Sequence, residues 1–314
     1  MEASQEGTSN TLLDLSHNLA NAVEQASAAV VAVNARPRVA TSGVHWRPGV
    51  IVSTDHTVKR DEEITVMLAD GRTVAATLAG RDPGTDLAVL RIEGDAGAES
   101  TVAKIGDTSQ LKIGNVVLAV GRTDDRGASA SFGIVSAVGS AWRTWRGGQI
   151  DQLLRLDLAI YLGFSGGALV DTQGHILGIN TSGLARGAGL AIPASTVNRV
   201  VDTLLAKGRI ARGYLGVGMQ PVRLPDAMRA TLNPQTDSGL IVLSVEPAGP
   251  AGRAGLMIGD VLFALDGAPV RETDYVQAVL GPERVGQAVR ASIIRGGTAQ
   301  ELTITVGERP RKGR

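Results

Sequence analysis

The sequence predicts a mainly β protein in which two β-barrels pack together and a smaller, β-rich α+β domain follows. Short runs rich in β-branched residues follow one another from residue 30 to residue 180, and no helical period separates them. A basic connector then leads into a second β-rich stretch of about a hundred residues, which is a normal size for a small domain. These observations predict the fold class.

The first predicted element is an amphipathic helix over Thr11–Gln25, where leucine and valine recur three and four residues apart. The barrel strands follow, and turn residues such as Asp70-Gly71 separate them. Strands are predicted at Val30–Val33, Gly49–Val52, Ile64–Leu68, Val74–Leu78, Leu87–Ile92, Val116–Val120, Phe132–Val138, Leu153–Ile160, Ala168–Val170 and His175–Asn180.

A second helix, Ser195–Ala206, is expected to close the barrel region, with Ser195 or Thr196 as its N-cap and Gly208 at its end. The polar, basic connector Lys207–Arg212 marks the boundary to the next domain. That domain is predicted to contain a helix at Asp274–Leu280 and strands at Tyr214–Met219, Leu240–Val245, Val261–Leu265, Val289–Ile294 and Glu301–Val306. The predicted segments are therefore an N-terminal helix (1–26), the barrels (27–207), the second domain (208–308) and a basic tail (309–314).

Composition excludes several classes of function. Lysine plus arginine and aspartate plus glutamate both number 31, so no basic excess favours nucleic acid or an anionic membrane. Cysteine is absent, which removes thiolate chemistry and disulfides. The histidines lack metal-ligand spacing, so no metal or other cofactor is expected. The most apolar early run, Ala26–Val33, is too short to span a bilayer, and no integral membrane segment is predicted.

The first residues are acidic and polar, and no basic segment precedes an apolar one as in a signal peptide. We therefore expect a cytoplasmic protein. The alternative is a periplasmic or cell-envelope location, if the chain is exported.

The loop Gly163–Ala168 is the candidate site of chemistry, because it places Ser165 between glycines and joins two apolar runs. Glycines let the backbone approach a substrate closely and let successive N–H groups point at one place, as an oxyanion hole requires. The same string also occurs in ordinary turns, and this sequence contains 40 glycines. The interpretation of Ser165 as a nucleophile therefore depends on finding a base and an acid elsewhere.

His56 and Asp86 supply these two groups. His56 follows a predicted strand, and Asp86 lies where a loop becomes a buried strand, a position in which a carboxylate can be shielded from water. A serine hydroxyl needs a base to take its proton, and the base needs an acid that fixes its tautomer. The chain order His, Asp, Ser is that of chymotrypsin-type double barrels.

With these residues in place, the sequence resembles the HtrA (high-temperature-requirement A) family of trypsin-fold serine proteases that carry a C-terminal PDZ domain. The resemblance extends from about Leu13 to Val306. The strings that carry it are Asp70–Arg72 with Ala75-Ala76, Gly80–Leu90, Ile105–Thr108, Phe132–Val138, Leu156-Asp157, Gly163–Val170, Leu177–Thr181 and Leu190–Pro193.

The resemblance implies a trypsin-like domain and an ATP-independent endopeptidase that cleaves unfolded or misfolded proteins in bacterial quality control and stress response. It implies His56 as general base, Asp86 as its orienting acid and Ser165 as nucleophile. The oxyanion hole would consist of the N–H groups of Gly163 and Ser165. The family is usually trimeric through its N-terminal segment, so a homotrimer is also implied.

Two departures from the family favour an alternative, a proteolytically dormant chaperone that still recognises peptides through its PDZ domain. Phe164 stands where the family usually has asparagine, and Thr54-Asp55 precedes the histidine in place of asparagine or alanine. We expect the Phe164 side chain to point away from the oxyanion hole. Asp55 either tunes the environment of His56 or faces solvent, and we expect the second. His45 and Trp46, in a less regular lead-in, are interpreted as surface loop residues.

Specificity in the trypsin fold depends partly on the S1 pocket, whose base lies six residues before the nucleophile. That residue is Ala159, so a buried basic side chain would find no acid there. Ile160, Tyr161, Leu162 and Leu190 would complete an apolar pocket. The prediction is a small or medium aliphatic P1 residue.

The start of the second domain resembles the carboxylate-binding loop of PDZ domains. The N–H groups of Leu215, Gly216 and Val217, which follow Tyr214, would hold a terminal carboxylate while the peptide adds as a strand beside Val217–Gln220. The pocket for an apolar last residue would be lined by Val217, Met219, Val276 and Leu280. The expected partners are therefore unfolded proteins and C-terminal peptides.

Overall fold

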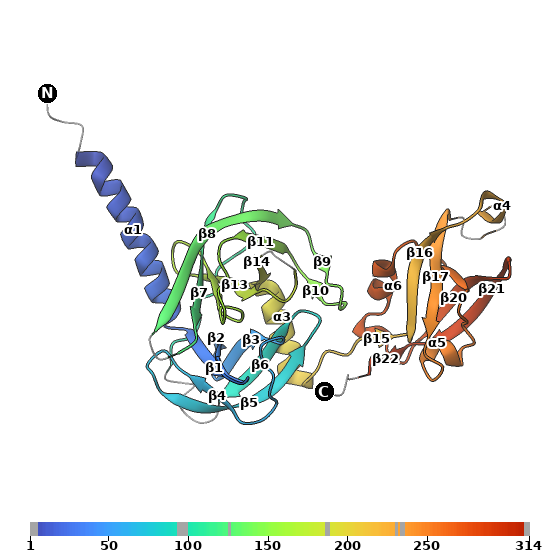
Figure 1. Cartoon of the computed structure of the whole chain (residues 1–314), viewed down its shortest axis with the longest axis horizontal. Coiled ribbons are helices and arrows are strands. Elements are labelled where there is room, and N and C mark those ends of the chain that lie inside the picture. The colour runs from blue at the N-terminus through green and yellow to red at the C-terminus, as the bar shows by residue number, and fades with distance from the viewer. Residues whose placement is uncertain are drawn as a thin grey trace. The chain divides into compact units, whose positions relative to one another are not determined.

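The structure is a computed structural model that describes residues 6–92, 100–124, 127–185, 189–229, 232 and 236–310. The chain divides into two units, residues 1–210 and residues 211–314 (Figure 1). Each unit has its own buried core, and each is described by itself.

The first unit contains two closed six-stranded barrels, which confirms the predicted double barrel. In the first barrel the strand order is β1-β2-β3-β6-β5-β4, and in the second it is β11-β14-β13-β12-β7-β8. The strands of the first barrel are β1 Val30–Asn34, β2 Thr41–Arg47, β3 Val50–Thr54, β4 Ile64–Met67, β5 Thr73–Asp82 and β6 Leu87–Ile92. Those of the second are β7 Val116–Arg122, β8 Ala128–Gly139, β11 Leu153–Asp157, β12 Ala168–Val170, β13 Ile176–Thr181 and β14 Gly189–Pro193, and a small hairpin is formed by β9 Trp142–Arg143 and β10 Gln149–Ile150.

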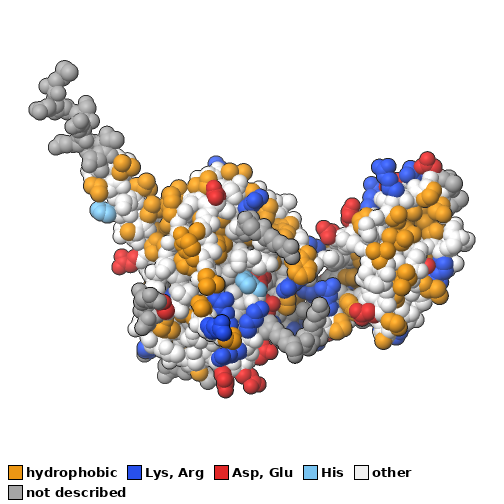
Figure 2. All heavy atoms as spheres, in the orientation of Figure 1, with side chains coloured by type: hydrophobic (Ala, Val, Ile, Leu, Met, Phe, Trp, Pro, Cys, Tyr) orange, Lys and Arg blue, Asp and Glu red, His pale blue; other side chains and the backbone are white. Residues whose placement is uncertain are grey.

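Among the described residues, two helices belong to this unit. The C-terminal end of α1 (Glu6–Ser27) packs on the barrels through buried alanines, whereas its earlier turns extend away from them (Figure 1). Leu12, Leu13 and Leu15 in those turns are mostly exposed, and Figure 2 shows apolar side chains along this part of the helix. Among the described residues, no helix is long and apolar enough to cross a membrane.

The helix α3 (Ala194–Lys207) buries the stripe of valine and leucine side chains that its periodicity predicts. It ends at Gly208, whose φ of 68° is left-handed and whose N–H donates to Leu204 O, as expected for a glycine C-cap. The predicted N-cap is wrong. Pro193 occupies that position without a side-chain bond, and Thr196 is buried, where its hydroxyl accepts from the Asp151 N–H at 2.9 Å.

The segment predicted as an irregular surface loop is the strand β2, and this expectation is therefore wrong. His45 is 1% exposed and Trp46 is 2% exposed. The Trp46 indole N–H donates to Asn198 Oδ1 on α3 at 2.8 Å, which satisfies its polar atom within the core.

His45 is held as a neutral imidazole. Its Nε2 accepts the Gly49 N–H at 3.2 Å, so its Nδ1 carries the proton, 3.1 Å from Thr101 O and 2.9 Å from Ser100 Oγ. Burial lowers the pKa of His45 below its usual value of about 6.5, although the contacts to the backbone at Thr101 and Arg47 partly offset this effect.

This burial predicts a pH dependence of stability. Because the pKa of His45 is lower in the folded state, the unfolded chain takes up this proton first as the pH falls below about 6.5. The contribution of His45 to stability is therefore complete above that pH and is lost as the pH falls through the folded-state pKa. We expect the thermal midpoint of the wild type to fall more steeply between pH 7.5 and pH 5 than that of His45→Gln, as followed by circular dichroism. Parallel curves for the two proteins would contradict this prediction.

The second unit is built on a six-stranded sheet of order β16-β17-β18-β20-β21, with β19 paired to β18. The strand β16 (Val217–Arg223) lies at the edge of this sheet. The other elements are β15 Gly213–Tyr214, β17 Ser238–Val245, β18 Val261–Leu265, β19 Ala268–Pro269, β20 Ala288–Arg295, β21 Thr298–Thr305, β22 Gly307–Glu308, α4 Asp226–Arg229, α5 Pro250–Arg253, α6 Thr273–Val279 and the 3-10 turn Pro282–Arg284.

Candidate active site

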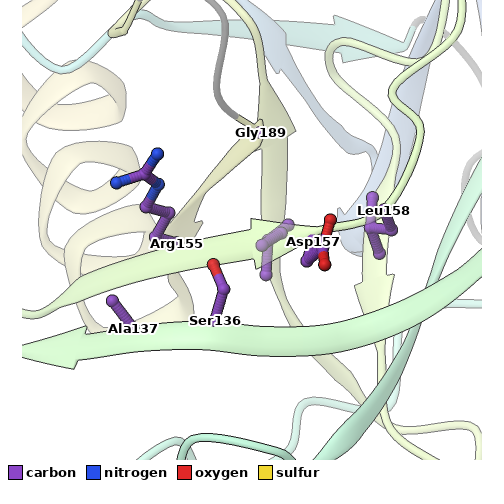
Figure 3. A pocket seen from close by; sticks show the side chains of 7 residues that line it. Ser136, Ala137, Arg155, Asp157, Leu158 and Gly189 are labelled. Atoms are coloured by element: carbon purple, nitrogen blue, oxygen red, sulfur yellow. The ribbon is translucent and has the colours of Figure 1, made fainter.

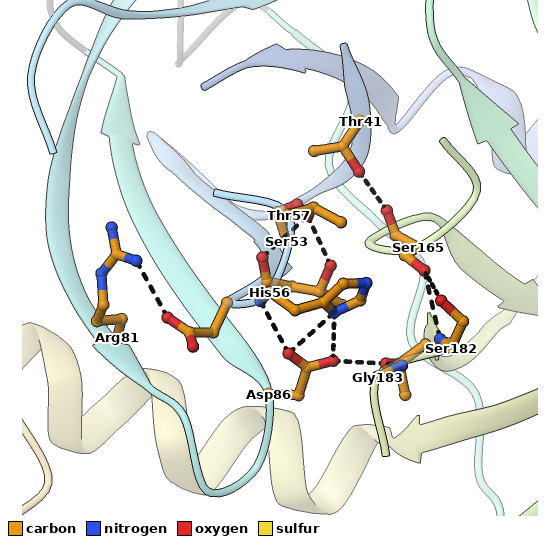
Figure 4. A network of polar contacts seen from close by, with 12 residues as sticks. Thr41, Ser53, His56, Thr57, Arg81, Asp86, Ser165, Ser182 and Gly183 are labelled. Atoms are coloured by element: carbon orange, nitrogen blue, oxygen red, sulfur yellow. Dashed lines mark hydrogen bonds and ion pairs between the residues drawn. The ribbon is translucent and has the colours of Figure 1, made fainter. Parts of the chain in front are cut away.

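His56 and Asp86 form a tightly bonded pair in the first barrel (Figure 4). His56 Nδ1 lies 2.8 Å from Asp86 Oδ2 and 3.0 Å from Oδ1, and the His56 backbone N–H donates to Oδ1 at 2.9 Å. Thr181, on β13 of the second barrel, donates its hydroxyl to Asp86 Oδ2 at 2.5 Å. The carboxylate is almost fully buried, so it fixes the orientation and tautomer of the imidazole.

A turn that is stabilised by its own internal hydrogen bonds holds Asp86 in place. Asp82 accepts the N–H groups of Gly84 at 3.1 Å and Thr85 at 3.2 Å, and it also accepts the Thr85 hydroxyl at 2.8 Å. Asp86 itself has a φ of +60°, a region that short polar side chains tolerate better than others. Thr144, between β9 and β10, donates to Gly84 O at 2.7 Å and connects this hairpin to the turn.

Contacts with the first barrel also fix the loop that carries Ser165. Thr41 donates its hydroxyl to Ser165 O at 2.7 Å, and Ser42 donates both its N–H and its hydroxyl to Gly163 O at 2.8 and 2.7 Å. Gly163 has a φ of +91°, and the Phe164 N–H donates to Tyr161 O at 2.9 Å. These features define a type II turn, which requires glycine at its third position.

The backbone N–H groups of this loop differ in whether they have a hydrogen-bond acceptor. The N–H groups of Phe164, Gly166 and Gly167 donate to backbone carbonyls at 2.9 Å each. Among the residues that the structure describes, no acceptor is found for the N–H groups of Gly163 and Ser165. An oxyanion hole needs such preorganised donors that are not already occupied.

The Ser165 hydroxyl does not contact the imidazole. Its Oγ lies 3.0 Å from Ser182 Oγ and accepts the Ser182 N–H at 3.3 Å (Figure 4). Within the described part of the chain, no hydrogen bond joins Ser165 to His56. The structure therefore brings the three predicted residues into one site in which the Ser165 hydroxyl and the His56 imidazole are not hydrogen-bonded to each other.

The expectation that Asp55 faces solvent is wrong. Asp55 is almost fully buried, and Arg81 donates to its Oδ1 at 3.1 Å (Figure 4). Arg81 also donates to Val58 O at 2.9 Å and pairs with Asp61. The carboxylate beside the histidine in sequence thus belongs to a separate ion-pair cluster, because burial of a charge requires a partner.

The Phe164 side chain is buried, with 4% of its surface exposed. Its ring meets Tyr161 edge to face, with centroids 5.3 Å apart. A Cβ added at Gly121 on β7 would lie 2.8 Å from Phe164 Cδ1, so this glycine makes room for the ring. Phe164 therefore changes the packing beneath the loop.

The five residues predicted for the S1 pocket are not equally buried. Leu190 is buried on β14, and Ile160 lies beside Gly189, where an added Cβ would be 3.2 Å from Ile160 Cδ1. Ala159 is exposed, and Tyr161 and Leu162 are 59% and 77% exposed. These last three therefore do not line a buried pocket in this structure.

A cavity of about 340 Å³ lies nearby, between β8, β11 and β14 (Figure 3). It contains none of the five predicted residues. Its lining is Ser136, Ala137, Arg155, Leu156, Asp157, Leu158 and Gly189.

The predicted peptide-binding residues of the second unit lie together at the β16 edge. Leu215, Val217, Met219, Val276 and Leu280 all belong to or pack against one apolar cluster. Gly216 has a φ of +78°, and the carbonyls of Leu215 and Gly216 accept the N–H groups of Ala251 at 2.9 Å and Glu246 at 2.8 Å. Among the described residues, no acceptor is found for the N–H groups of Leu215 and Gly216.

Tyr214 begins this segment, and Glu246 influences its phenol. Burial, together with hydrogen bonding to Glu246 and the Glu246 charge, raises the pKa of the Tyr214 phenol, while the charge of Arg309 acts in the opposite direction. Tyr214 therefore remains a neutral donor at physiological pH.

Sequence reasoning missed the roles of Thr181, Ser182 and Gly183. Thr181 was part of a matching string, but nothing in its spacing revealed that it bonds Asp86 across the barrels. Gly183 lies so close to the histidine–aspartate pair that an added Cβ would be 2.7 Å from both Asp86 Oδ2 and His56 Nδ1. The one feature of the sequence that could indicate this close approach is a glycine shortly after a buried strand.

Two closed barrels with a histidine and an aspartate in one and a serine loop in the other define the trypsin-like class of serine peptidases. A family model described as a trypsin-like peptidase domain matches residues 41–179, and one described as a PDZ domain matches residues 213–306. The chain belongs to the HtrA family, in which these two domains are joined.

Similarities to curated relatives and to solved structures support the assignment to this family. A "probable periplasmic serine endoprotease DegP-like" of Brucella suis is 36% identical over 88% of this chain, and a "putative serine protease HhoA" of Synechocystis is 32% identical over 83% of it and 68% of the relative. The structure of "HtrA-type protease AlgW with decapeptide" matches with a TM-score of 0.73 and 30% identity, over 94% of this chain and 99% of that one. A serine endoprotease from Yersinia pestis matches with a TM-score of 0.74 and 32% identity, over 93% and 98%.

The chain spans about half the length of the DegP-like relatives, 54% in the case of Brucella suis. The expected cytoplasmic location is wrong. Relatives from Brucella, Rhizobium meliloti and Pseudomonas putida are named periplasmic endoproteases, which points to the periplasm. The expectation depended on the composition of the first residues alone, and these do not determine the compartment.

Proposed function

We propose that this chain is a serine endopeptidase of the HtrA type that cleaves unfolded or misfolded proteins without ATP in protein quality control. The observation that carries the proposal is the pair of N–H groups at Gly163 and Ser165, which have no acceptor among the described residues, in the same site as a histidine bonded to a buried aspartate. No metal or nucleotide is needed for this chemistry.

In the proposed reaction, Ser165 Oγ attacks the scissile carbonyl while its proton passes to His56 Nε2. Asp86 holds the imidazole through Nδ1 and stabilises the charged form. The negative charge that develops on the carbonyl oxygen is stabilised by the N–H groups of Gly163 and Ser165. His56 then donates the proton to the leaving amine, and a water molecule activated by the same imidazole hydrolyses the acyl-enzyme.

The apolar residues near the site support cleavage after small or medium aliphatic P1 residues. Leu190 is the buried member of the predicted S1 set, and Ile160 is half-buried. Ala159, Tyr161 and Leu162 would have to turn toward the P1 side chain when a substrate is present. No acid among these five residues could pair with a basic P1 side chain.

The second unit is proposed to bind the C-terminal residues of protein substrates or of activating peptides. The N–H groups of Leu215 and Gly216 would hold the terminal carboxylate, and the peptide would pair with the free edge of β16. The apolar cluster around Val217, Met219 and Val276 favours an apolar last residue.

A homotrimer is proposed from the family membership, with α1 as its contact. The exposed Leu12, Leu13 and Leu15 supply an apolar surface that a neighbouring copy would cover.

The experiment that tests the protease proposal compares wild type and Ser165→Ala. We expect wild type to digest an unfolded protein such as casein and to be labelled at Ser165 by a serine-directed phosphonate, whereas the variant does neither. Equal digestion by both proteins would contradict the proposal. A wild type that stays unlabelled yet prevents aggregation of an unfolded protein would instead support the dormant chaperone.

A further inference from the structure

The nucleophile hydroxyl is held by a residue outside the catalytic set. Ser165 Oγ is within hydrogen-bond distance of both Ser182 Oγ and the Ser182 N–H, at 3.0 and 3.3 Å (Figure 4). The imidazole of His56 is meanwhile already bonded to Asp86. A serine hydroxyl becomes a nucleophile only when its proton can pass to the base. In this arrangement Asp86 orients the His56 imidazole, whereas the Ser165 hydroxyl points toward Ser182.

Hydrogen bonds hold the backbone around Ser165. Its carbonyl accepts the Thr41 hydroxyl at 2.7 Å, and the next N–H, that of Gly166, donates to Asn180 O at 2.9 Å. Both groups belong to the peptide that follows Ser165, and the peptide that precedes it is held at Phe164 O, which accepts the Gly167 N–H at 2.9 Å. The movement that these bonds leave to the hydroxyl is a rotation between staggered positions about the Cα–Cβ bond.

We propose that Ser182 is a positioning residue that competes with His56 for the Ser165 hydroxyl and so sets the fraction of molecules whose nucleophile faces the base. The inference rests on the proposed protease function. The observed reactivity of a site scales with the fraction in the competent state. Among the described residues, Ser182 makes no hydrogen bond to His56 or Asp86, so it acts on the nucleophile and not on the base.

The test measures the rate at which a serine-directed phosphonate labels Ser165 in the full chain, followed by intact-mass spectrometry. Ser182→Ala removes the competing hydroxyl and should accelerate labelling about two- to tenfold, the range that corresponds to the net contribution of one hydrogen bond. Ser182→Thr keeps a hydroxyl on the same carbon and should label at close to the wild-type rate. The pH midpoint of the labelling rate should be the same in all three proteins.

The outcomes separate this inference from the proposed function. If neither wild type nor Ser182→Ala is labelled, the protease function itself fails, and the inference fails with it. If wild type is labelled and Ser182→Ala is labelled at the same rate or more slowly, the protease function stands and the competition is refuted. A shifted pH midpoint in Ser182→Ala would show that Ser182 acts through His56, which also overturns the inference. Thermal unfolding of each variant verifies that the fold is retained.

Discussion

Replacing Asp86 by asparagine is expected to lower kcat for peptide hydrolysis by about 10⁴-fold, the loss typical of this substitution in a trypsin-type triad. Asp86 accepts from His56 Nδ1 through both of its oxygens, and it accepts from Thr181 as well. An amide places an N–H group opposite Nδ1 and so favours the imidazole tautomer that carries its proton on Nε2. In that tautomer His56 cannot accept the Ser165 proton. KM should change little, because Asp86 does not face the substrate.

The chain contains a matched control for this change. His175 Nδ1 lies 3.1 Å from Asp171 Oδ2 in the turn between β12 and β13, so the same two side chains pair there away from the site. Asp171→Asn should therefore leave kcat near the wild-type value. Steady-state kinetics on one peptide substrate compares the two variants. If Asp86→Asn retained more than about a tenth of the wild-type kcat, Asp86 would not be the orienting acid.

The strands with continuous β-branched runs could be predicted from the sequence, whereas β2 could not. Its sequence contains Thr41, Ser42 and His45, polar residues that normally indicate a loop, yet the structure buries them all. Thr41 and Ser42 are satisfied by the carbonyls of Ser165 and Gly163, more than a hundred residues away. A local pattern cannot reveal a partner that only the packing of two barrels supplies.

The same limit applies to the candidate site. The order of His56, Asp86 and Ser165 and the strings around them located three side chains that the structure brings into one site. Whether Ser165 bonds to His56 or to Ser182 depends on a single side-chain rotation, which no spacing encodes. The exposure of Tyr161 and Leu162 likewise depends on the loop conformation and not on residue type.

Gly183→Ala is expected to lower kcat/KM by about 100-fold, although it adds one methyl group outside the three catalytic residues. The new Cβ would lie 2.7 Å from both Asp86 Oδ2 and His56 Nδ1, closer than carbon atoms approach such groups in proteins. The Gly183 backbone does not have a positive φ, so alanine adopts it without strain. The added methyl must therefore push the histidine and the aspartate apart, and a displacement of about 1 Å in a catalytic group costs about 10²-fold in rate.

Gly139→Ala is the matched control, since its added Cβ would meet only the Leu153 side chain, at 3.2 Å on the opposite strand. Steady-state kinetics should show wild-type kcat/KM for this variant, while binding of an apolar C-terminal peptide to the second unit should be unchanged in both variants. Normal activity in Gly183→Ala would mean that the pair tolerates displacement, and it would contradict a role for Gly183 in admitting the imidazole to its position. Because glycine is the one residue without a Cβ, the chain after β13 can pass directly against the pair and shield its hydrogen bond from water, which strengthens the bond that orients the base.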